Sequence, residues 1–193
     1  MTAVAQPGQR VVLIFSMGVS ADGFVNDRDG AFAWTPPTEE LFAFHLDRVS
    51  SLGAHLSGRR LYQAMLPWET DPSMRSSAAQ AEFADVWTAL PKVVFSRTLD
   101  RVEGNARLAT GPVAEEVAAV LAGTESDVEI GGATVAAAAI ELDLVDDFRI
   151  FRYPVVVGGG TPYFPPVARE RSLELVETRT FEPGVVYERY RRR

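Results

Sequence analysis

The sequence predicts an α/β domain with a mainly parallel central sheet and antiparallel strands at its C-terminal edge. Apolar strand segments alternate with helical segments from residue 10 to about residue 157. Two final segments, 172–178 and 185–191, alternate apolar and polar residues around Glu182-Pro183-Gly184, a pattern typical of a hairpin. The composition shows no linker-like break and no internal repeat, so we expect one domain spanning residues 1–193.

The composition also argues against several classes of function. The chain has no cysteine, which removes disulfides and thiolate chemistry, and two histidines are too few for a histidine metal site. A formal net charge of −7 argues against nucleic acid as a partner. No apolar run reaches the length of a membrane span. Residues 1–9 are expected to form a flexible tail without a signal-peptide core, so we expect a cytoplasmic protein.

The N-terminal half begins with a nearly continuous apolar run at 10–17, as expected for a central strand covered on both faces. A glycine- and aspartate-rich loop follows at 18–30. The segment 35–40 combines prolines, a capping threonine and two carboxylates, which predicts a helix that should end near Gly53. The rest of this half reads as a strand at 54–57, a polar connection at 67–77 and a helix at 79–90.

The C-terminal half repeats the alternation of strand and helix. Strands are expected at 92–95 and 105–109, followed by a helix at 110–121. A short strand at 128–130 leads through Gly131-Gly132 into a helix whose apolar spacing continues to Val145. The segment 147–157 reads as one long strand that ends in a glycine-rich turn at 158–162.

Three polar junctions each follow a predicted parallel strand. Because the carboxyl ends of such strands meet at one edge of a sheet, we expect these junctions to share a rim. The glycine pair at 131–132 would place unpaired N–H groups at a helix N-terminus, which suits a phosphate, although an ordinary tight turn explains it equally well. The triple glycine at 158–160 is either a competing phosphate loop or a mobile turn. The three junctions are Gly58-Arg59-Arg60, Ser96-Arg97-Thr98 and Gly131-Gly132-Ala133-Thr134.

Three candidate phosphate-binding junctions suit a dinucleotide with an additional phosphate better than a mononucleotide. The common G-x-G-x-x-G fingerprint is absent. No acidic residue follows the strand at 54–57 to bind a ribose hydroxyl, and Arg59 and Arg60 stand there instead. Arginine at this place favours the 2′-phosphate of NADP over NAD.

At this point the chain resembles the dihydrofolate reductase-like superfamily, and within it the C-terminal reductase domain of the riboflavin biosynthesis protein RibD. The resemblance extends from Val11 to about Tyr190 and rests on the order and spacing of five motifs. The motifs are Ser20-Ala21-Asp22-Gly23-Phe24, Gly58-Arg59-Arg60-Leu61-Tyr62, Phe95-Ser96-Arg97-Thr98-Leu99, Ile130-Gly131-Gly132-Ala133-Thr134 and Pro154-Val155-Val156-Val157-Gly158-Gly159-Gly160.

The resemblance implies a three-layer α/β/α fold, NADPH as cofactor and a homodimer. It places the 2′-phosphate at the first two junctions and the pyrophosphate at the third, and it places nicotinamide and substrate beside the first strand. The implied cofactor-binding residues are Met17, Gly18, Gly58, Arg59, Arg60, Leu61, Ser96, Arg97, Thr98, Gly131, Gly132, Ala133, Thr134 and Val135.

Departures from the family pattern leave the substrate open. Ala133 replaces a frequent third glycine, which is a small change. The segment 65–72 is acidic and aromatic where reductases of a phosphoribosyl substrate are basic, and this puts that substrate in doubt. Dihydrofolate reductases carry a carboxylate early in their first helix, a place that Glu39 or Glu40 could take, although such residues also stabilise a helix start by themselves.

We therefore expect an NADPH-dependent reductase that transfers hydride to a C=N or C=O bond of a pterin- or pyrimidine-like small molecule. Asp22 is the candidate proton donor, or else a turn residue of its loop. Phe24, Trp34 and Glu39 are the candidate substrate contacts. Two alternatives remain: a non-catalytic NADP-binding module, and a dimerisation domain built on the terminal hairpin.

Overall fold

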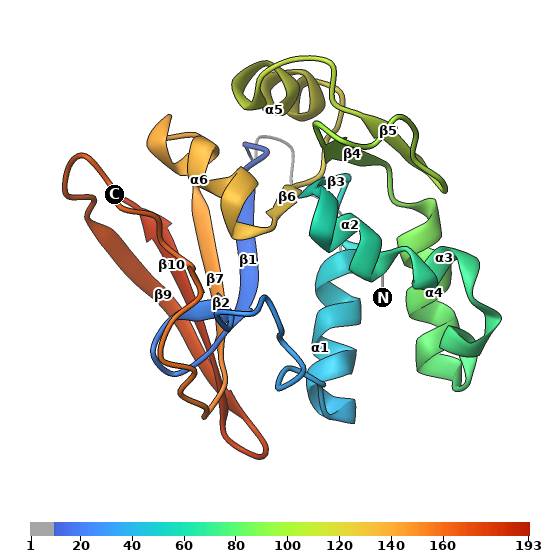
Figure 1. Cartoon of the computed structure of the whole chain (residues 1–193), viewed down its shortest axis with the longest axis horizontal. Helices are drawn as coiled ribbons and strands as arrows, with labels where there is room; N and C mark the ends of the chain where they lie inside the picture. The colour runs from blue at the N-terminus through green and yellow to red at the C-terminus, as the bar shows by residue number, and fades with distance from the viewer. Residues whose placement is uncertain (1–9) are drawn as a thin grey trace.

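The computed structural model describes residues 10–193, so the expected tail at 1–9 lies outside the described residues. Its centre is an eight-stranded sheet in the order β5-β4-β3-β6-β1-β7-β10-β9 (Figure 1). The first six strands are parallel, and β10 and β9 join them antiparallel at one edge. The strands are β1 Leu13–Val19, β3 Ala54–Gly58, β4 Lys92–Phe95, β5 Ala106–Leu108, β6 Val128–Gly131, β7 Asp147–Arg152, β9 Leu173–Phe181 and β10 Val185–Arg192.

Helices cover both faces of this sheet, which gives three layers. Side chains of α1 and α4 pack with Ile14 on one face, and side chains of α5 and α6 pack with Leu13 and Phe15 on the other. The predicted α/β/α architecture with antiparallel C-terminal strands is therefore confirmed. The helices are α1 Glu39–Ser50, α2 Arg59–Met65, α3 Pro67–Thr70, the 3₁₀ helix η1 Pro72–Arg75, α4 Ala78–Ala89, α5 Val113–Ala122 and α6 Ala133–Glu141. Among residues 10–193, no helix combines the length and apolarity needed to cross a membrane.

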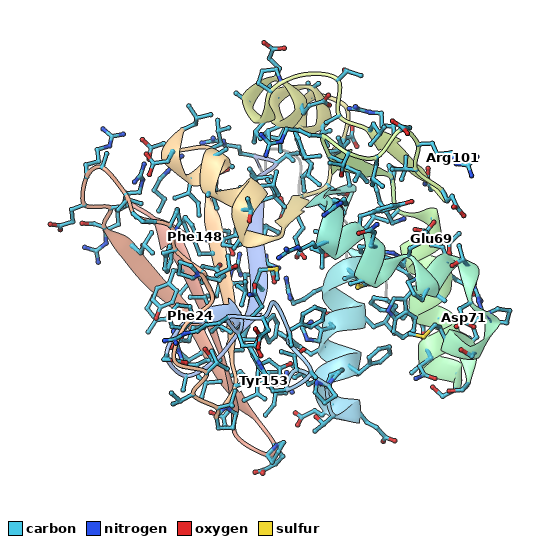
Figure 2. All side chains as sticks on the ribbon, viewed as in Figure 1. Phe24, Glu69, Asp71, Arg101, Phe148 and Tyr153 are labelled. Atoms are coloured by element: carbon cyan, nitrogen blue, oxygen red, sulfur yellow. The ribbon has the colours of Figure 1, made fainter. Side chains whose placement is uncertain are left out.

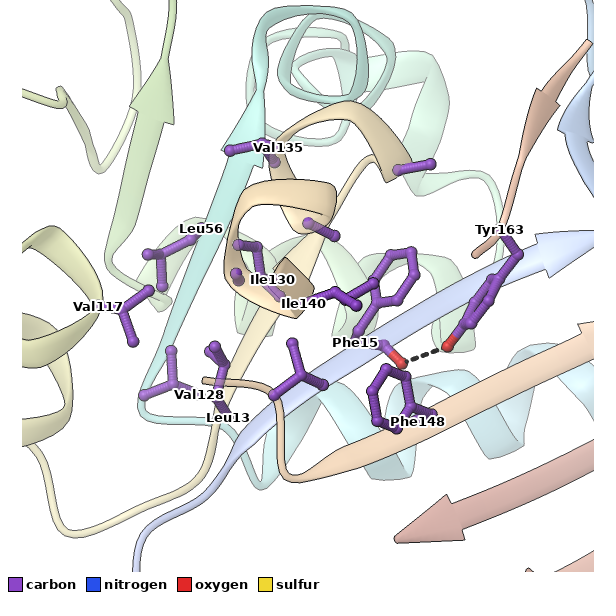
Figure 3. Packing of buried hydrophobic residues seen from close by; sticks show 14 of the residues in the cluster. Leu13, Phe15, Leu56, Val117, Val128, Ile130, Val135, Ile140, Phe148 and Tyr163 are labelled. Atoms are coloured by element: carbon purple, nitrogen blue, oxygen red, sulfur yellow. Dashed lines mark hydrogen bonds between the residues drawn. The ribbon is translucent and has the colours of Figure 1, made fainter. Parts of the chain in front are cut away.

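The face beneath α5 and α6 is a continuous apolar core. Leu13, Phe15, Leu56 and Ile130 are completely inaccessible to solvent and interlock with residues of α6 (Figure 3). Tyr163 stacks on Phe15 with ring centroids 4.2 Å apart, and its hydroxyl donates a 2.9 Å hydrogen bond to the Phe15 carbonyl. This bond satisfies the one polar atom that Tyr163 brings into the core.

The predicted elements are found, several of them with different bounds. The first strand, expected at 10–17, lies at 13–19. The strand expected at 147–157 ends at Arg152, because Pro154 has no N–H to continue the ladder. The helix expected to reach Val145 ends at Glu141, and Asp143 takes a left-handed conformation with φ 56°. The polar connection expected at 67–77 is largely helical, as α3 and η1.

The loop expected at 18–30 contains a short strand, β2, which the sequence did not indicate. β2, Phe24–Asn26, pairs antiparallel with β8, Thr161–Pro162, directly after the triple glycine. Gly160 has φ 137°, and a side chain there would collide with the carbonyl of Asn26. The glycines at 158–160 therefore allow close approach of two chain segments, as expected for a turn.

Candidate functional site

The three polar junctions predicted from the sequence lie side by side at the carboxyl edge of the sheet. Gly58 at the end of β3 is in register with Phe95 at the end of β4, and Ser57 is in register with Gly131 of β6. The Arg59 guanidinium donates a 3.0 Å hydrogen bond to the Thr98 hydroxyl, which joins the first junction to the second. The convergence expected for parallel strands is thus present.

The glycine pair at the third junction serves two purposes. Gly131 is buried, and a side chain there would collide with Leu61 of α2, so this glycine permits packing between the junctions. Gly132 caps α6 with φ 88°, a conformation that favours glycine. Its N–H donates to the Met17 sulfur at 3.3 Å, a weak acceptor that a phosphate oxygen could replace. This arrangement also brings Met17 of β1 to the same rim.

Basic side chains gather at this rim although the chain as a whole is acidic. Arg59, Arg60 and Arg97 are exposed, and none forms an ion pair with a carboxylate within residues 10–193. Ser96 shapes the turn between them, because its hydroxyl accepts from the N–H groups of Thr98 at 3.1 Å and Leu99 at 3.0 Å. Guanidinium groups without carboxylate partners are suited to phosphate.

An open cavity of about 400 Å³ adjoins these arginines. Arg60 lines one side, the turn from Asn26 to Gly30 lines a second, and Gly160 and Thr161 line a third. Arg28 stabilises the mouth of the cavity, since its guanidinium donates a 2.6 Å hydrogen bond to the Gly158 carbonyl. The cavity is polar and charged, and Arg60 is the rim residue that lines it.

Asp22 connects two loops at the surface. Its carboxylate accepts hydrogen bonds from the N–H groups of Val157 at 3.2 Å and Gly158 at 2.8 Å. The pKa of Asp22 is lowered, first by a hydrogen bond from Ser20 and then by these backbone donors. A carboxyl group held in its ionised form is a poor proton donor, so the contacts favour a role in bracing segment 157–158.

Aromatic side chains surround the end of β1 opposite the arginines. A side chain at Gly18 would lie 3.2 Å from the Tyr153 ring and 3.5 Å from the Thr35 methyl group. Tyr153 donates a 3.1 Å hydrogen bond to the Thr35 carbonyl, and Trp34 meets the Tyr153 ring edge-on at 5.9 Å. Of the predicted substrate contacts, Trp34 is therefore near Gly18.

The other two predicted substrate contacts are less closely associated with this region. Phe24 is a half-buried residue of β2 (Figure 2), and Glu39 is exposed in the first turn of α1. Leu41, fully buried, faces the cluster that contains Tyr153.

Sequence reasoning missed a buried polar group on the α1 face of the sheet. Arg48 of α1 donates to the Ser16 hydroxyl at 3.0 Å and to the Glu129 carboxylate at 2.8 Å. His55 lies 3.9 Å from the other Glu129 oxygen. Burial raises the pKa of Glu129 and lowers the pKa of Arg48, and it lowers the pKa of His55 to about 3. The available signal was a glutamate within the apolar strand at 128–130 and an arginine on the inner side of α1.

The residues at the rim fit a dinucleotide with an additional phosphate. The guanidinium groups of Arg59 and Arg97, without carboxylate partners in residues 10–193, supply charge at one end, and the Gly132 N–H at the start of α6 supplies a backbone donor at the other. Between them, Gly58 lies close to Gly132, since a side chain at Gly132 would come within 3.7 Å of the Gly58 nitrogen.

Comparisons with known proteins agree with this architecture. The family model of the RibD C-terminal domain matches residues 11–187. The uncharacterized protein YyaP of Bacillus subtilis (strain 168) is 31% identical over 179 residues, which cover 90% of this chain and 91% of YyaP.

Two solved structures share the fold. A putative riboflavin biosynthesis protein from Shewanella sp. PV-4 superposes with a TM-score of 0.77 at 20% identity, covering 95% of this chain and 99% of that one. Dihydrofolate reductase from Enterococcus faecalis, complexed with NADP(H), superposes with a TM-score of 0.61 at 18% identity, covering 95% and 97%. The fold is thus dihydrofolate reductase-like, and the chain belongs to the RibD C-terminal domain family.

Proposed function

We propose that this protein is an NADPH-dependent reductase that transfers hydride to a C=N or C=O bond of a pterin- or pyrimidine-like small molecule. The observation that carries the proposal is the convergence of three arginines, none of them paired with a carboxylate among residues 10–193, and a helix N-terminus at the sheet rim. Family membership supports a reductase of the RibD or dihydrofolate reductase type.

In this proposal the residues of the rim bind and orient the cofactor. Arg59, Arg97 and Ser96 hold the 2′-phosphate, and Gly132 and Thr134 hold the pyrophosphate. Arg60, Leu61, Thr98, Gly131, Ala133 and Val135 complete the walls of the same cleft. Bound NADPH would supply the hydride, while Met17 and Gly18 position its nicotinamide at the end of β1. Tyr153 and Trp34 would exclude water beside Gly18.

The proposal predicts a preference for NADPH over NADH. We expect saturable NADPH binding in a fluorescence titration. Arg59→Ala and Arg97→Ala should each weaken NADPH binding about 10- to 100-fold, because each variant loses a hydrogen bond to the charged 2′-phosphate. NADH lacks this phosphate, so its binding should be nearly unchanged. Arg75→Ala is the matched control, because Arg75 is paired with Asp85 on the surface. Equal affinity for both nucleotides, or no saturable binding, would contradict the proposal.

A non-catalytic NADP-binding module is the second candidate, and the position of Asp22 favours it. This carboxylate is exposed and bonded to the backbone at 157–158, so it is not available as a ready proton donor. If the protein binds NADPH but no acceptor oxidises it, and Asp22→Asn changes neither result, the protein is a non-catalytic NADP-binding module and not a reductase.

We also propose a homodimer, as the resemblance implies. Leu175 of the edge strand β9 is 54% exposed and pairs across the sheet with Tyr190, which in turn pairs with Phe148. Phe164, also exposed, lies 5.5 Å from the buried Phe148 ring, so Leu175 and Phe164 are exposed apolar side chains at this edge of the sheet.

If a second copy covers this surface, a charged substitution there should prevent dimerisation in solution. We expect light scattering to report a dimer that Leu175→Glu converts to monomer. Val156→Glu is the control, because Val156 is 73% exposed on a loop outside this surface. A wild-type monomer at micromolar concentration would rule out this part of the proposal.

A further inference from the structure

The α1 face of the central sheet contains a buried charge cluster that the proposed cofactor site does not use. Its members are Arg48, Glu129, Asp147, Arg149 and Arg189. On the opposite face of β1, β6 and β7, apolar side chains such as Leu13, Phe15 and Ile130 form the core (Figure 3), and charge returns only nearer the surface, with the Arg152–Glu188 pair. Parallel strands buried on both faces normally carry apolar side chains on both, so the cluster requires a reason.

The cluster contains more positive than negative charge. Arg48 pairs with Glu129 at 2.8 Å, while Arg149 at 2.9 Å and Arg189 at 2.7 Å share the single carboxylate of Asp147. With the more exposed neighbours Arg191, 3.8 Å from Asp147, and Glu177, in register with Arg189, four guanidinium groups face three carboxylates. The Arg48 Nε is buried without a hydrogen-bond partner among the described residues, so this guanidinium retains an unused donor.

Ser16 of β1 joins this cluster two residues before Gly18. Its hydroxyl oxygen accepts from Arg48 at 3.0 Å, and an arginine can only donate, so the hydroxyl hydrogen is left for another acceptor. Within residues 10–193 no acceptor for that hydrogen is present, although Ser16 is only 8% exposed. Ser16 and Gly18 point to the same face of β1, because side chains alternate along a strand. The unused donor therefore lies beneath the region lined by Thr35 and Tyr153.

Stability alone does not explain such an arrangement. A buried ion pair is often no more stabilising than apolar residues of the same volume, because both charges lose their hydration. A charge in a region of low dielectric nevertheless acts strongly on nearby groups. Burial also raises the pKa of Glu129, and protonation of this carboxyl group would increase the positive excess.

We propose that Ser16 and the Arg48 guanidinium behind it select an uncharged or anionic carbonyl or imine acceptor and disfavour a cationic one. This inference rests on the proposed reductase function and names the charge class of its substrate. Ser16 donates a hydrogen bond to the oxygen or nitrogen of the acceptor, and Arg48 is a positioning residue that polarises this hydroxyl.

The chemistry of reduction requires such a group. When a hydride adds to the carbon of a C=O or C=N bond, the π-electron pair moves to oxygen or nitrogen, and that atom gains negative charge. A donor aimed at this atom stabilises the charge, and a proton from water completes the reduction. A cluster with excess positive charge favours this development, whereas it repels an acceptor that is already a cation.

Three aldehydes of similar shape provide the test: 4-formylbenzoate as anion, 4-methylbenzaldehyde as neutral acceptor and 4-formyl-1-methylpyridinium as cation. NADPH binding is measured first for every variant. NADPH oxidation with each aldehyde then gives kcat and KM, and the anion-to-cation ratio of kcat/KM is compared between variants. This ratio cancels the intrinsic reactivity of each aldehyde.

We expect Ser16→Ala to lower kcat about 10-fold or more for the anionic and neutral aldehydes, as for loss of one donor to a developing oxyanion. Arg48→Met should lower the anion-to-cation ratio about 10-fold, and Glu129→Gln, which removes a negative charge, should raise it. Glu115→Gln is the control: it removes an exposed carboxylate of α5, on the other face of the sheet, and it should leave the ratio unchanged.

Several results would overturn the inference. One is an unchanged ratio in both Arg48→Met and Glu129→Gln, and another is no reduction of the anionic or neutral aldehyde by a wild-type protein that binds NADPH. In both cases the cofactor site would stand. Failure of the wild type to bind NADPH would refute the proposed function itself. If Arg48→Met does not fold, Ser16→Ala and Glu129→Gln still decide the question.

Discussion

At the scale of single residues, Lys92 shows how the fold accommodates a buried charge by surrounding it with partners. Lys92, the only lysine, has a side chain that is 2% exposed and pairs with Glu69 at 3.0 Å. Its ammonium group also donates to the carbonyls of Trp87 at 2.5 Å and Leu90 at 2.8 Å, so all three of its hydrogens are engaged. The sequence indicated neither the burial nor the partner, because Glu69 is distant in the chain and lay within an expected polar connection.

Removing one partner of this pair should be strongly destabilising. We expect Lys92→Met to lower the free energy of unfolding by about 3 kcal/mol, because it leaves the Glu69 charge buried without its partner. Urea denaturation measures the change. The double variant Lys92→Met with Glu69→Met should recover part of the loss, and a double variant less stable than the single one would contradict this account.

At the scale of elements, short segments depend on contacts that local patterns do not reveal. β2 has three residues and β8 has two, and their pairing depends on Gly160 approaching Asn26. The start of α5 is a similar case. Pro112 precedes the helix and offers no capping side chain, and Glu116 accepts instead from the N–H groups of Thr110 at 2.6 Å and Gly111 at 3.2 Å.

This capping carboxylate should make stability depend on pH in the acid range. A hydrogen bond from Arg107, followed by the backbone donors, lowers the pKa of Glu116 to about 2. A lowered folded-state pKa means that the stabilisation is complete above the unfolded value near 4.5 and is lost as pH falls toward 2. We expect a contribution of about 2 kcal/mol, reduced by solvent screening at Arg107.

Thermal or urea denaturation between pH 2 and pH 6 tests this contribution. Glu116→Gln should flatten the pH dependence and lower stability at pH 6 while changing little at pH 2. The control Glu115→Gln alters a neighbouring carboxylate of the same first helical turn. An identical pH profile for Glu116→Gln and wild type would show that this cap carries no acid-dependent stability.

At the scale of the whole molecule, the sequence predicted the mainly parallel sheet and the shared rim because both follow from general rules. Strand-to-glycine junctions such as Gly58 and Gly131 can be read locally, and parallel strands then place them at one edge. The buried set around Arg48 could not be predicted in this way. It joins Ser16, Arg48 and Glu129 from three distant parts of the chain, and their contact depends on packing between α1 and the sheet.

The central claim is that the three junctions form one NADPH cleft, and a crystal structure of the protein with NADP⁺ tests it most directly. We expect the 2′-phosphate between Arg59 and Ser96, the pyrophosphate at the Gly132 N–H in place of the Met17 sulfur, and the nicotinamide beside Gly18. Nucleotide density at another surface, with this rim empty at saturating NADP⁺, would contradict the claim.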